Sequence, residues 1–177
     1  MVMPSGVRCI YLIGLMGAGK STVGKFLATI LNWQFVDLDH EIEVLTGLDI
    51  SSIFEKQGEA HFRTYESQLL EKTSDLKDAI VACGGGVVTQ EQNLKFLQDK
   101  TVVWLDLSPA EAAARLEHSP NRPLLNGCQD TLVQLNEILL ARRDAYTRAA
   151  RVRISSGGVL PEVLATDIVH QLVELYA

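Results

Sequence analysis

Residues 14–21 read GLMGAGKS and constrain this chain more than any other segment. They match the pattern GxxxxGK[ST], follow an apolar run at residues 8–13 and precede an amphipathic pattern at residues 20–31. Glycines let successive backbone N–H groups face inward around an anion, and the helix that follows adds the positive end of its dipole. The segment therefore predicts a strand, a phosphate-binding loop and a helix, in that order.

This loop predicts binding of a nucleoside triphosphate. Lys20 is spaced to reach the outer phosphates, and Ser21 can offer its hydroxyl to Mg²⁺, which prefers oxygen ligands and bridges phosphates during phosphoryl transfer. We expect the nucleotide contacts of this segment at Gly17, Ala18, Gly19, Lys20, Ser21 and Thr22. The pattern says nothing about the acceptor of the phosphoryl group.

Five short apolar runs alternate with segments of helix length, which predicts an α/β fold with a parallel sheet. The expected strands cover residues 8–13, 34–37, 79–83, 101–105 and 151–155. The expected helices cover residues 20–31, 39–45, 51–54, 59–73, 91–98, 109–118, 132–149 and 160–175. With 177 residues and no repeat or linker, the chain is expected to form one three-layer domain over residues 1–177, with a central five-stranded parallel sheet flanked by helices.

Charge and cysteine content exclude several classes of protein. The formal net charge of −6 argues against nucleic-acid binding, which depends largely on Lys and Arg. Cys9, Cys83 and Cys128 form no CxxC pair, so neither a disulfide framework nor a zinc site is indicated. The apolar stretch at residues 9–18 is far shorter than the ~20 residues of a membrane helix. We expect a cytoplasmic protein with no membrane partner and no targeting segment.

A pair of aspartates, Asp37 and Asp39, comes directly after the second expected strand. Carboxylates at the carboxyl end of a parallel strand should lie beside the phosphate loop if the two strands are neighbours. One of them could orient the water shell of the metal while the other accepts a proton from an acceptor hydroxyl. An ordinary acidic helix start, with Asp39 as the N-cap, is the plainer alternative.

Three consecutive glycines, Gly84, Gly85 and Gly86, follow the third expected strand. Such a run carries a large entropic cost on folding, which indicates backbone held close to another group. A tight turn is the alternative, although a turn rarely needs more than one or two glycines.

Taken together, six motifs resemble the shikimate kinase family, whose members phosphorylate the 3-hydroxyl of shikimate with ATP. They are GLMGAGKS at 14–21, DxD at 37–39, GExxFRxxE at 58–66, GGG at 84–86, RPLL at 122–125 and RxxxY at 142–146. The likeness spans nearly the whole chain, with the motifs in order and at matching spacing. It implies a P-loop kinase domain that uses ATP and Mg²⁺, with a small substrate-binding segment at about 38–66 and a lid at about 117–129.

The resemblance also implies roles for individual residues in the shikimate pocket. Asp39, Arg63, Gly84, Gly85, Gly86 and Arg142 would line this pocket. Asp39 would hold the ring hydroxyls and act as the base, and the arginines would take the substrate carboxylate. Glu66 would fix an arginine or the ring hydroxyls.

On the nucleotide side, the resemblance places Arg122 on the lid, where it would meet the γ-phosphate on closure and exclude water. Arg115 would pack over adenine, with residues 155–161 as the opposite wall. Lys20, Asp39 and Arg122 are thus the expected catalytic residues, and Ser21 and Asp37 the expected metal-side residues, Asp37 acting directly or through water.

The chain departs from the family pattern near its last motif. The family often reads RxPxY, whereas Asp144 stands here in place of proline, and the adjacent Arg143 competes with Arg142 as the carboxylate-binding residue. We prefer Arg142 because residues four apart, such as Arg142 and Tyr146, share one helical face. Asp106, at the end of another apolar strand, could serve the metal, but the family pattern favours Asp37.

Other functions fit the phosphate loop alone. A gluconate kinase or a nucleoside monophosphate kinase would share the loop, and a kinase-like binding module without catalysis is a further alternative. The presence of Lys20, Ser21, Asp37, Asp39 and Arg122 argues against a degenerate site. We expect an active monomer whose partner is a small-molecule substrate.

Overall fold

The computed structural model describes residues 3–4, 6–117, 124 and 130–177. It contains a single parallel sheet with the strand order β2-β3-β1-β4-β5, which confirms the predicted fold class. The strands are β1 (Cys9–Ile13), β2 (Gln34–Asp37), β3 (Ala79–Ala82), β4 (Thr101–Asp106) and β5 (Val152–Ser155). The connection from β1 leads to β2 on one side of the sheet, whereas the connection from β3 leads to β4 on the other side. Ligands of open α/β sheets bind at the carboxyl ends of the strands where the strand order changes direction in this way.

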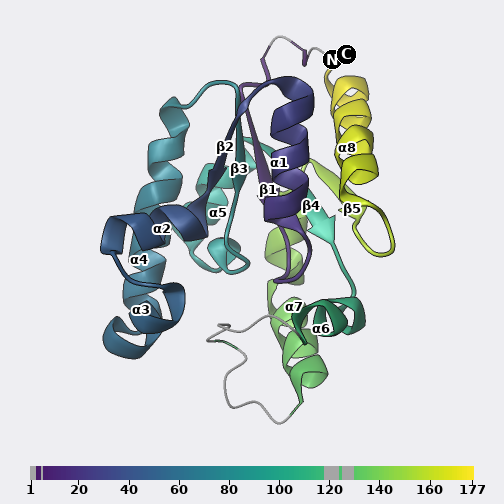
Figure 1. The fold of residues 1–177 in the computed structure, drawn as a ribbon. Helices are drawn as coiled ribbons and strands as arrows, with labels where there is room; N and C mark the ends of the chain where they lie inside the picture. Colours follow the sequence, from purple (N-terminus) through teal and green to yellow (C-terminus); the bar gives the residue numbers. More distant parts are fainter. Residues whose placement is uncertain (1–2, 5, 118–123, 125–129) are drawn as a thin grey trace.

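Helices cover both faces of the sheet (Figure 1). On one face lie α1 (Lys20–Leu31) and α8 (Pro161–Tyr176), packed side by side. On the other face lie α4 (Glu59–Lys72), α5 (Glu91–Gln98) and α7 (Thr131–Ala149). Beside α4 pack α2 (Leu38–Thr46) and α3 (Ile50–Gln57), whereas α6 (Pro109–Leu116) packs on α7. No described helix is long and apolar enough to cross a membrane.

The central strand shows why both sheet faces are covered. In β1, Ile10 and Leu12 point into the core beneath α1 and α8, whereas Tyr11 and Ile13 point into the core beneath α5 and α7. Side chains alternate between the two faces of a strand, so an uninterrupted apolar run requires a hydrophobic layer on each side. All four side chains are buried, and the sheet is the rigid support from which the site loops extend.

Most predicted boundaries are confirmed to within one or two residues, and α3 is the main difference. It begins one residue before the predicted start, where Asp49 caps it by accepting from the Ser52 N–H at 2.7 Å, and it runs three residues beyond the predicted end, where Gly58 follows it. The cap of α2 is Asp37, which accepts from the Asp39 N–H at 3.1 Å, so Asp39 is not the cap. Two short 3₁₀ turns, η1 (Thr73–Asp75) and η2 (Val87–Thr89), were not predicted.

Candidate active site

The phosphate loop between β1 and α1 has a backbone that only glycine adopts readily. Gly14, Gly17 and Gly19 have φ values of 140°, 82° and 89°. A Cβ on Gly14 would overlap the Leu105 carbonyl oxygen, so this glycine is also required for the loop to approach β4. Lys20 folds back over the loop and donates from Nζ to the Gly14 and Leu15 carbonyls at 2.9 and 3.0 Å. The loop is therefore a preformed anion-binding site, and the ammonium group of Lys20 lies at its opening.

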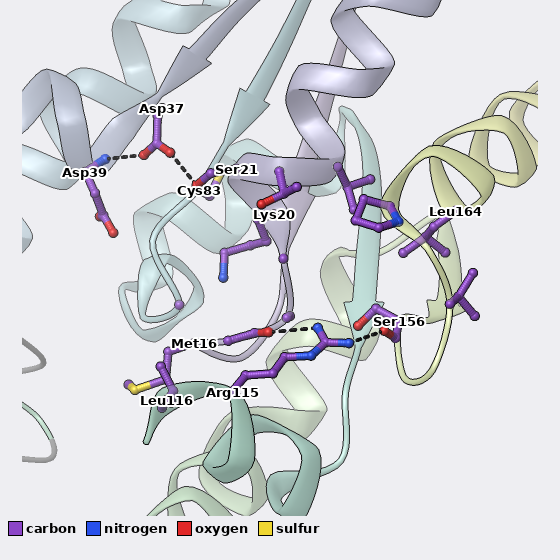
Figure 2. Close-up of a pocket in the computed structure, with 18 residues that line it drawn as sticks. Met16, Lys20, Ser21, Asp37, Asp39, Cys83, Arg115, Leu116, Ser156 and Leu164 are labelled. Carbon is purple, nitrogen blue, oxygen red and sulfur yellow. Dashed lines mark hydrogen bonds between the residues drawn. The ribbon is translucent and has the colours of Figure 1, made fainter. Parts of the chain in front are cut away.

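Asp37 connects this loop to the end of β2. Its carboxylate accepts from the Ser21 hydroxyl at 2.5 Å and from the Asp39 N–H, so that Asp37 lies between the two (Figure 2). A serine hydroxyl beside a carboxylate offers the oxygen ligands that Mg²⁺ prefers, and Mg²⁺ commonly takes one or two protein oxygens together with phosphates and water. The residues present thus fit a Mg²⁺–nucleotide complex.

Asp106, the other aspartate at a strand end, is already engaged in an ion pair. Its Oδ2 accepts from the guanidinium of Arg153 at 2.6 and 3.0 Å, and this guanidinium lies over the Trp104 ring. A carboxylate held by a forked cation is a poor candidate for the metal side of the site.

A cleft of about 470 Å³ extends from the phosphate loop toward α8. It is lined by residues 16–23 and by Asp37, Asp39, Cys83, Gly85, Arg115, Leu116, Ser156, Val159, Pro161 and Leu164. Figure 2 shows Arg115 bridging its floor, where it donates to the Gly17 carbonyl at 3.0 Å and to the Ser156 carbonyl at 2.8 Å. The predicted wall at residues 155–161 is therefore tied to the phosphate loop by the arginine predicted to cover the base.

A second, smaller cavity of about 60 Å³ adjoins the cleft. Its lining comes from seven separate segments: Met16, Asp39, Ile50, Phe54, Phe62, Arg63, Glu66, Gly84, Gly85, Gly86, Leu124 and Arg142. Met16, Asp39 and Gly85 line both spaces. The structure thus brings all six predicted acceptor-side residues together, at the boundary of the nucleotide cleft.

Buried charges on α4 form one side of this cavity. Arg63 donates to Glu66 at 2.8 Å and to Glu59 at 2.9 and 3.1 Å, with Arg63 only 6% and Glu66 0% exposed. Burial raises the pKa of Glu66 to about 7, although the adjacent Arg63 guanidinium acts to lower it. Burial acts to lower the pKa of Arg63, but its carboxylate partners outweigh this effect and the net shift is upward.

Charged side chains approach the backbone of the glycine run so closely that two of its positions have no room for a Cβ atom. A Cβ on Gly84 would overlap a carboxylate oxygen of Glu66 and lie 3.0 Å from Asp39 Oδ1. A Cβ on Gly86 would overlap the Arg63 guanidinium, with Cζ at 2.5 Å. These two glycines allow the charged side chains of α2 and α4 to pack directly against backbone, as the close-approach prediction required.

Helix α7 supplies Arg142 to the same cavity. This side chain is 8% exposed and donates from Nη1 to the Gly85 carbonyl at 3.1 Å, whereas Arg143 is exposed on the outer face of the helix. The placement favours Arg142 over Arg143 as the cavity arginine. Asp144, in place of the family proline, lies exposed on α7 with Arg148 at 3.8 Å. Because Asp144 has a backbone N–H, the helix continues through this position without a break.

Two partners in the site lie within the motifs but were not predicted as site residues. Tyr146 is fully buried and donates its hydroxyl to the Gly85 carbonyl at 2.5 Å, and Glu59 holds the outer edge of Arg63. The spacing of four residues between Glu59 and Arg63 on one helix could have indicated the second contact. Arg122 and most of the predicted lid lie outside the described residues. Among the described residues of that stretch, Leu124 alone lines the smaller cavity.

Fold and site together define a P-loop phosphotransferase that acts on a small anionic acceptor. The sequence matches the family model described as shikimate kinase over residues 16–173. It is 45% identical over 155 residues to the shikimate kinase of Gloeobacter violaceus, covering 87% of this chain and 86% of that protein. The structure is similar to a shikimate kinase from Acinetobacter baumannii in complex with shikimate, with a TM-score of 0.93 and 37% identity over 96% of this chain and 95% of the other.

The chain therefore belongs to the shikimate kinase family. It is an ATP-dependent phosphotransferase of aromatic amino acid biosynthesis that phosphorylates shikimate, and its phosphoryl donor is ATP with Mg²⁺. A gluconokinase from Sinorhizobium meliloti is also similar, with a TM-score of 0.62 over 96% of this chain and 93% of the other. At 16% identity that likeness shows a shared fold and nothing more.

Proposed function

We propose that this chain transfers the γ-phosphoryl group of ATP to the 3-hydroxyl of shikimate at the boundary of the two cavities, with Asp39 as the base. The observation that carries this proposal is the position of Asp39, which lines both the nucleotide cleft and the acceptor cavity. A carboxylate at this boundary can accept the proton of an acceptor hydroxyl as that oxygen attacks phosphorus.

Arg63 and Arg142 take the carboxylate of shikimate in this proposal. They reach the cavity from α4 and α7, where Arg63 is anchored by Glu66 and Glu59, and Arg142 by the Gly85 carbonyl. A guanidinium has five N–H groups in a fixed plane, so each anchored arginine keeps N–H groups for a ligand. Gly84, Gly85 and Gly86 form the wall against which the ring of the acceptor lies.

On the donor side, the amides from Gly17 to Thr22 cradle the phosphates and Lys20 neutralises the outer ones. Ser21 and Asp37 would hold the magnesium side of the complex, with Asp37 acting directly or through a water molecule. Mg²⁺, when bound with the nucleotide, would neutralise charge on its outer phosphates. Arg115 fixes the wall of the base site through its bonds to Gly17 and Ser156.

Arg122 completes the proposed set from the lid at about 117–129. An arginine delivered only when the lid closes would stabilise the transferred group after water has been excluded. The substrate-binding segment at about 38–66 would supply Asp39, Arg63 and Glu66 to the same closed site. We propose that all of these parts belong to one domain over residues 1–177.

The proposal also covers the location, the oligomeric state and the partners of the chain. We propose a cytoplasmic monomer that binds no nucleic acid, because the net charge of −6 disfavours a phosphate backbone.

A coupled ADP-release assay tests the proposed chemistry. Shikimate, gluconate and nucleoside monophosphates are offered in parallel with Mg²⁺–ATP to the purified chain. We expect turnover on shikimate alone, with the product phosphorylated at the 3-hydroxyl by NMR. Turnover on gluconate or a monophosphate in its place would contradict the proposal, and so would ADP release that does not depend on an acceptor.

A further inference from the structure

The three carbonyl groups of the glycine run are held in two different ways. The Gly84 carbonyl accepts from the Val87 N–H at 3.1 Å, and the Gly86 carbonyl accepts from the Thr89 N–H at 2.9 Å and its hydroxyl at 2.7 Å. These bonds close the local turn η2, so they shape the run without fixing it relative to the rest of the site. Glycines have no Cβ to pack, which leaves backbone contacts as the means of holding such a segment in place.

The middle carbonyl, that of Gly85, is held from another element. It accepts from the Tyr146 hydroxyl at 2.5 Å and from Arg142 Nη1 at 3.1 Å, both on the same face of α7. Gly85 is also the only residue of the run that lines both cavities. These two bonds therefore fix the position of the wall that separates nucleotide from acceptor.

Tyr146 is itself rigidly placed. It is fully buried, and its ring stacks on that of Trp104 with centroids 5.5 Å apart and an interplanar angle of 29°. Trp104 is buried in β4 next to the start of the phosphate loop, where its Cδ1 would lie 3.4 Å from a Cβ on Gly14. A hydroxyl mounted on such a ring is a fixed point, whereas the long side chain of Arg142 is not.

We propose that Tyr146 is a positioning residue for the acceptor, whose hydroxyl fixes the Gly85 carbonyl and, through that carbonyl, the guanidinium plane of Arg142. The inference rests on the proposed function, in which Arg142 binds the acceptor carboxylate. Without the hydroxyl, Arg142 would be anchored to a carbonyl that is free to shift with a flexible glycine run. Binding of the acceptor should weaken, while the phosphate loop keeps its own contacts.

The test compares Tyr146→Phe with Tyr11→Phe. Tyr11 is a matched control because it is also buried on the same side of the sheet, and its hydroxyl bonds to Thr73 outside both cavities. We expect Tyr146→Phe to raise the KM for shikimate about 3- to 10-fold, with kcat and the KM for ATP changed by less than about twofold. Tyr11→Phe should leave all three constants unchanged, although both variants lose a buried hydroxyl and some stability.

An unchanged KM for shikimate in Tyr146→Phe, or an equal rise in both variants, would overturn the inference. If urea melts show that Tyr146→Phe is not folded, Trp104→Phe takes its place, because it removes the ring that supports Tyr146. The KM for shikimate of Trp104→Phe should then rise selectively but by a smaller factor, and an unchanged KM in that variant would overturn the inference. If the unaltered chain does not phosphorylate shikimate, the proposed function fails and takes the inference with it. Turnover by the unaltered chain with no selective effect in the variants removes the inference alone.

Discussion

The nucleotide cleft and the acceptor cavity lie side by side but are built on opposite principles. The cleft is wide, about 470 Å³, and its phosphate end is made from the backbone of one continuous loop. The acceptor cavity is about 60 Å³ and is lined by charged side chains from α2, α4 and α7, of which those on α4 and α7 are buried, next to the backbone of the three glycines. A common donor can be held by a local structure, whereas selection of one acceptor requires side chains converging from distant parts of the chain.

The largest effect expected is on the donor side, from Lys20→Met. Removing the ammonium group takes away the charge that faces the outer phosphates, so kcat should fall about a thousandfold. Lys25→Met, on the exposed face of the same helix, is the matched control and should keep its activity. Rates from the coupled assay, read beside urea melts, check the prediction. Equal losses of kcat in the two variants would contradict the assignment of Lys20 to the phosphates of the donor.

On the acceptor side, Gly84→Ala and Gly86→Ala should raise the KM for shikimate about 100-fold, because the new Cβ overlaps Glu66 or Arg63 and displaces a charged group. Gly85→Ala is the internal comparison, since its Cβ would meet the Gly14 oxygen and Met16 nitrogen at an ordinary 3.4 Å. Initial rates over a range of shikimate concentrations give the ranking. Gly85→Ala as the most damaging of the three would refute the close-approach account.

A smaller effect is expected at the metal side from Asp37→Asn. Asparagine keeps the size and the helix-capping ability of aspartate but removes the charge next to Ser21, so the Mg²⁺ concentration for half-maximal activity should rise about tenfold. Asp106→Asn, at the end of β4, should leave this concentration unchanged because Asp106 is paired with Arg153. Magnesium titrations of both variants decide the matter, and a shift in Asp106→Asn alone would reverse the assignment.

The smallest effect concerns the pH dependence of stability at Glu66. Its pKa is raised to about 7 in the folded chain, from an ordinary value of 4.5, so the native state holds this proton more tightly than the unfolded chain does. The stabilisation is fully present below about pH 4.5 and is lost as the pH rises through about 7.

Glu66→Gln should therefore flatten part of the fall in unfolding free energy between pH 5 and pH 8, by on the order of 1 kcal/mol. Urea unfolding at several pH values measures it. Glu59→Gln is the control, because Glu59 also contacts Arg63 but its side chain is 49% exposed. Parallel curves for the unaltered chain and Glu66→Gln would show that the burial of this carboxyl has no such linkage.

The same contrast explains what could be predicted from sequence. The phosphate loop was predictable because residues 14–21 carry its whole geometry, and the sheet was predictable because apolar runs such as residues 101–105 have strand length. Asp39 and the glycine run stood out because each follows an expected strand, whereas Arg63 and Arg142 were reached through resemblance, since nothing local relates one to the other. The bond from Tyr146 to Gly85 joins positions 61 residues apart and depends on the packing of α7 against η2, which no spacing reveals.

Asp39→Asn tests the central claim most directly, because Asp39 lines both cavities and is the proposed base. The measurement pairs single-turnover transfer with the thermal shift produced by Mg²⁺–ATP, which reports binding to the native state independently of chemistry. The account predicts that transfer falls at least about 100-fold while the affinity for ATP changes by less than about twofold. Transfer at the unaltered rate with intact ATP binding would show that Asp39 is not the base and would contradict the account.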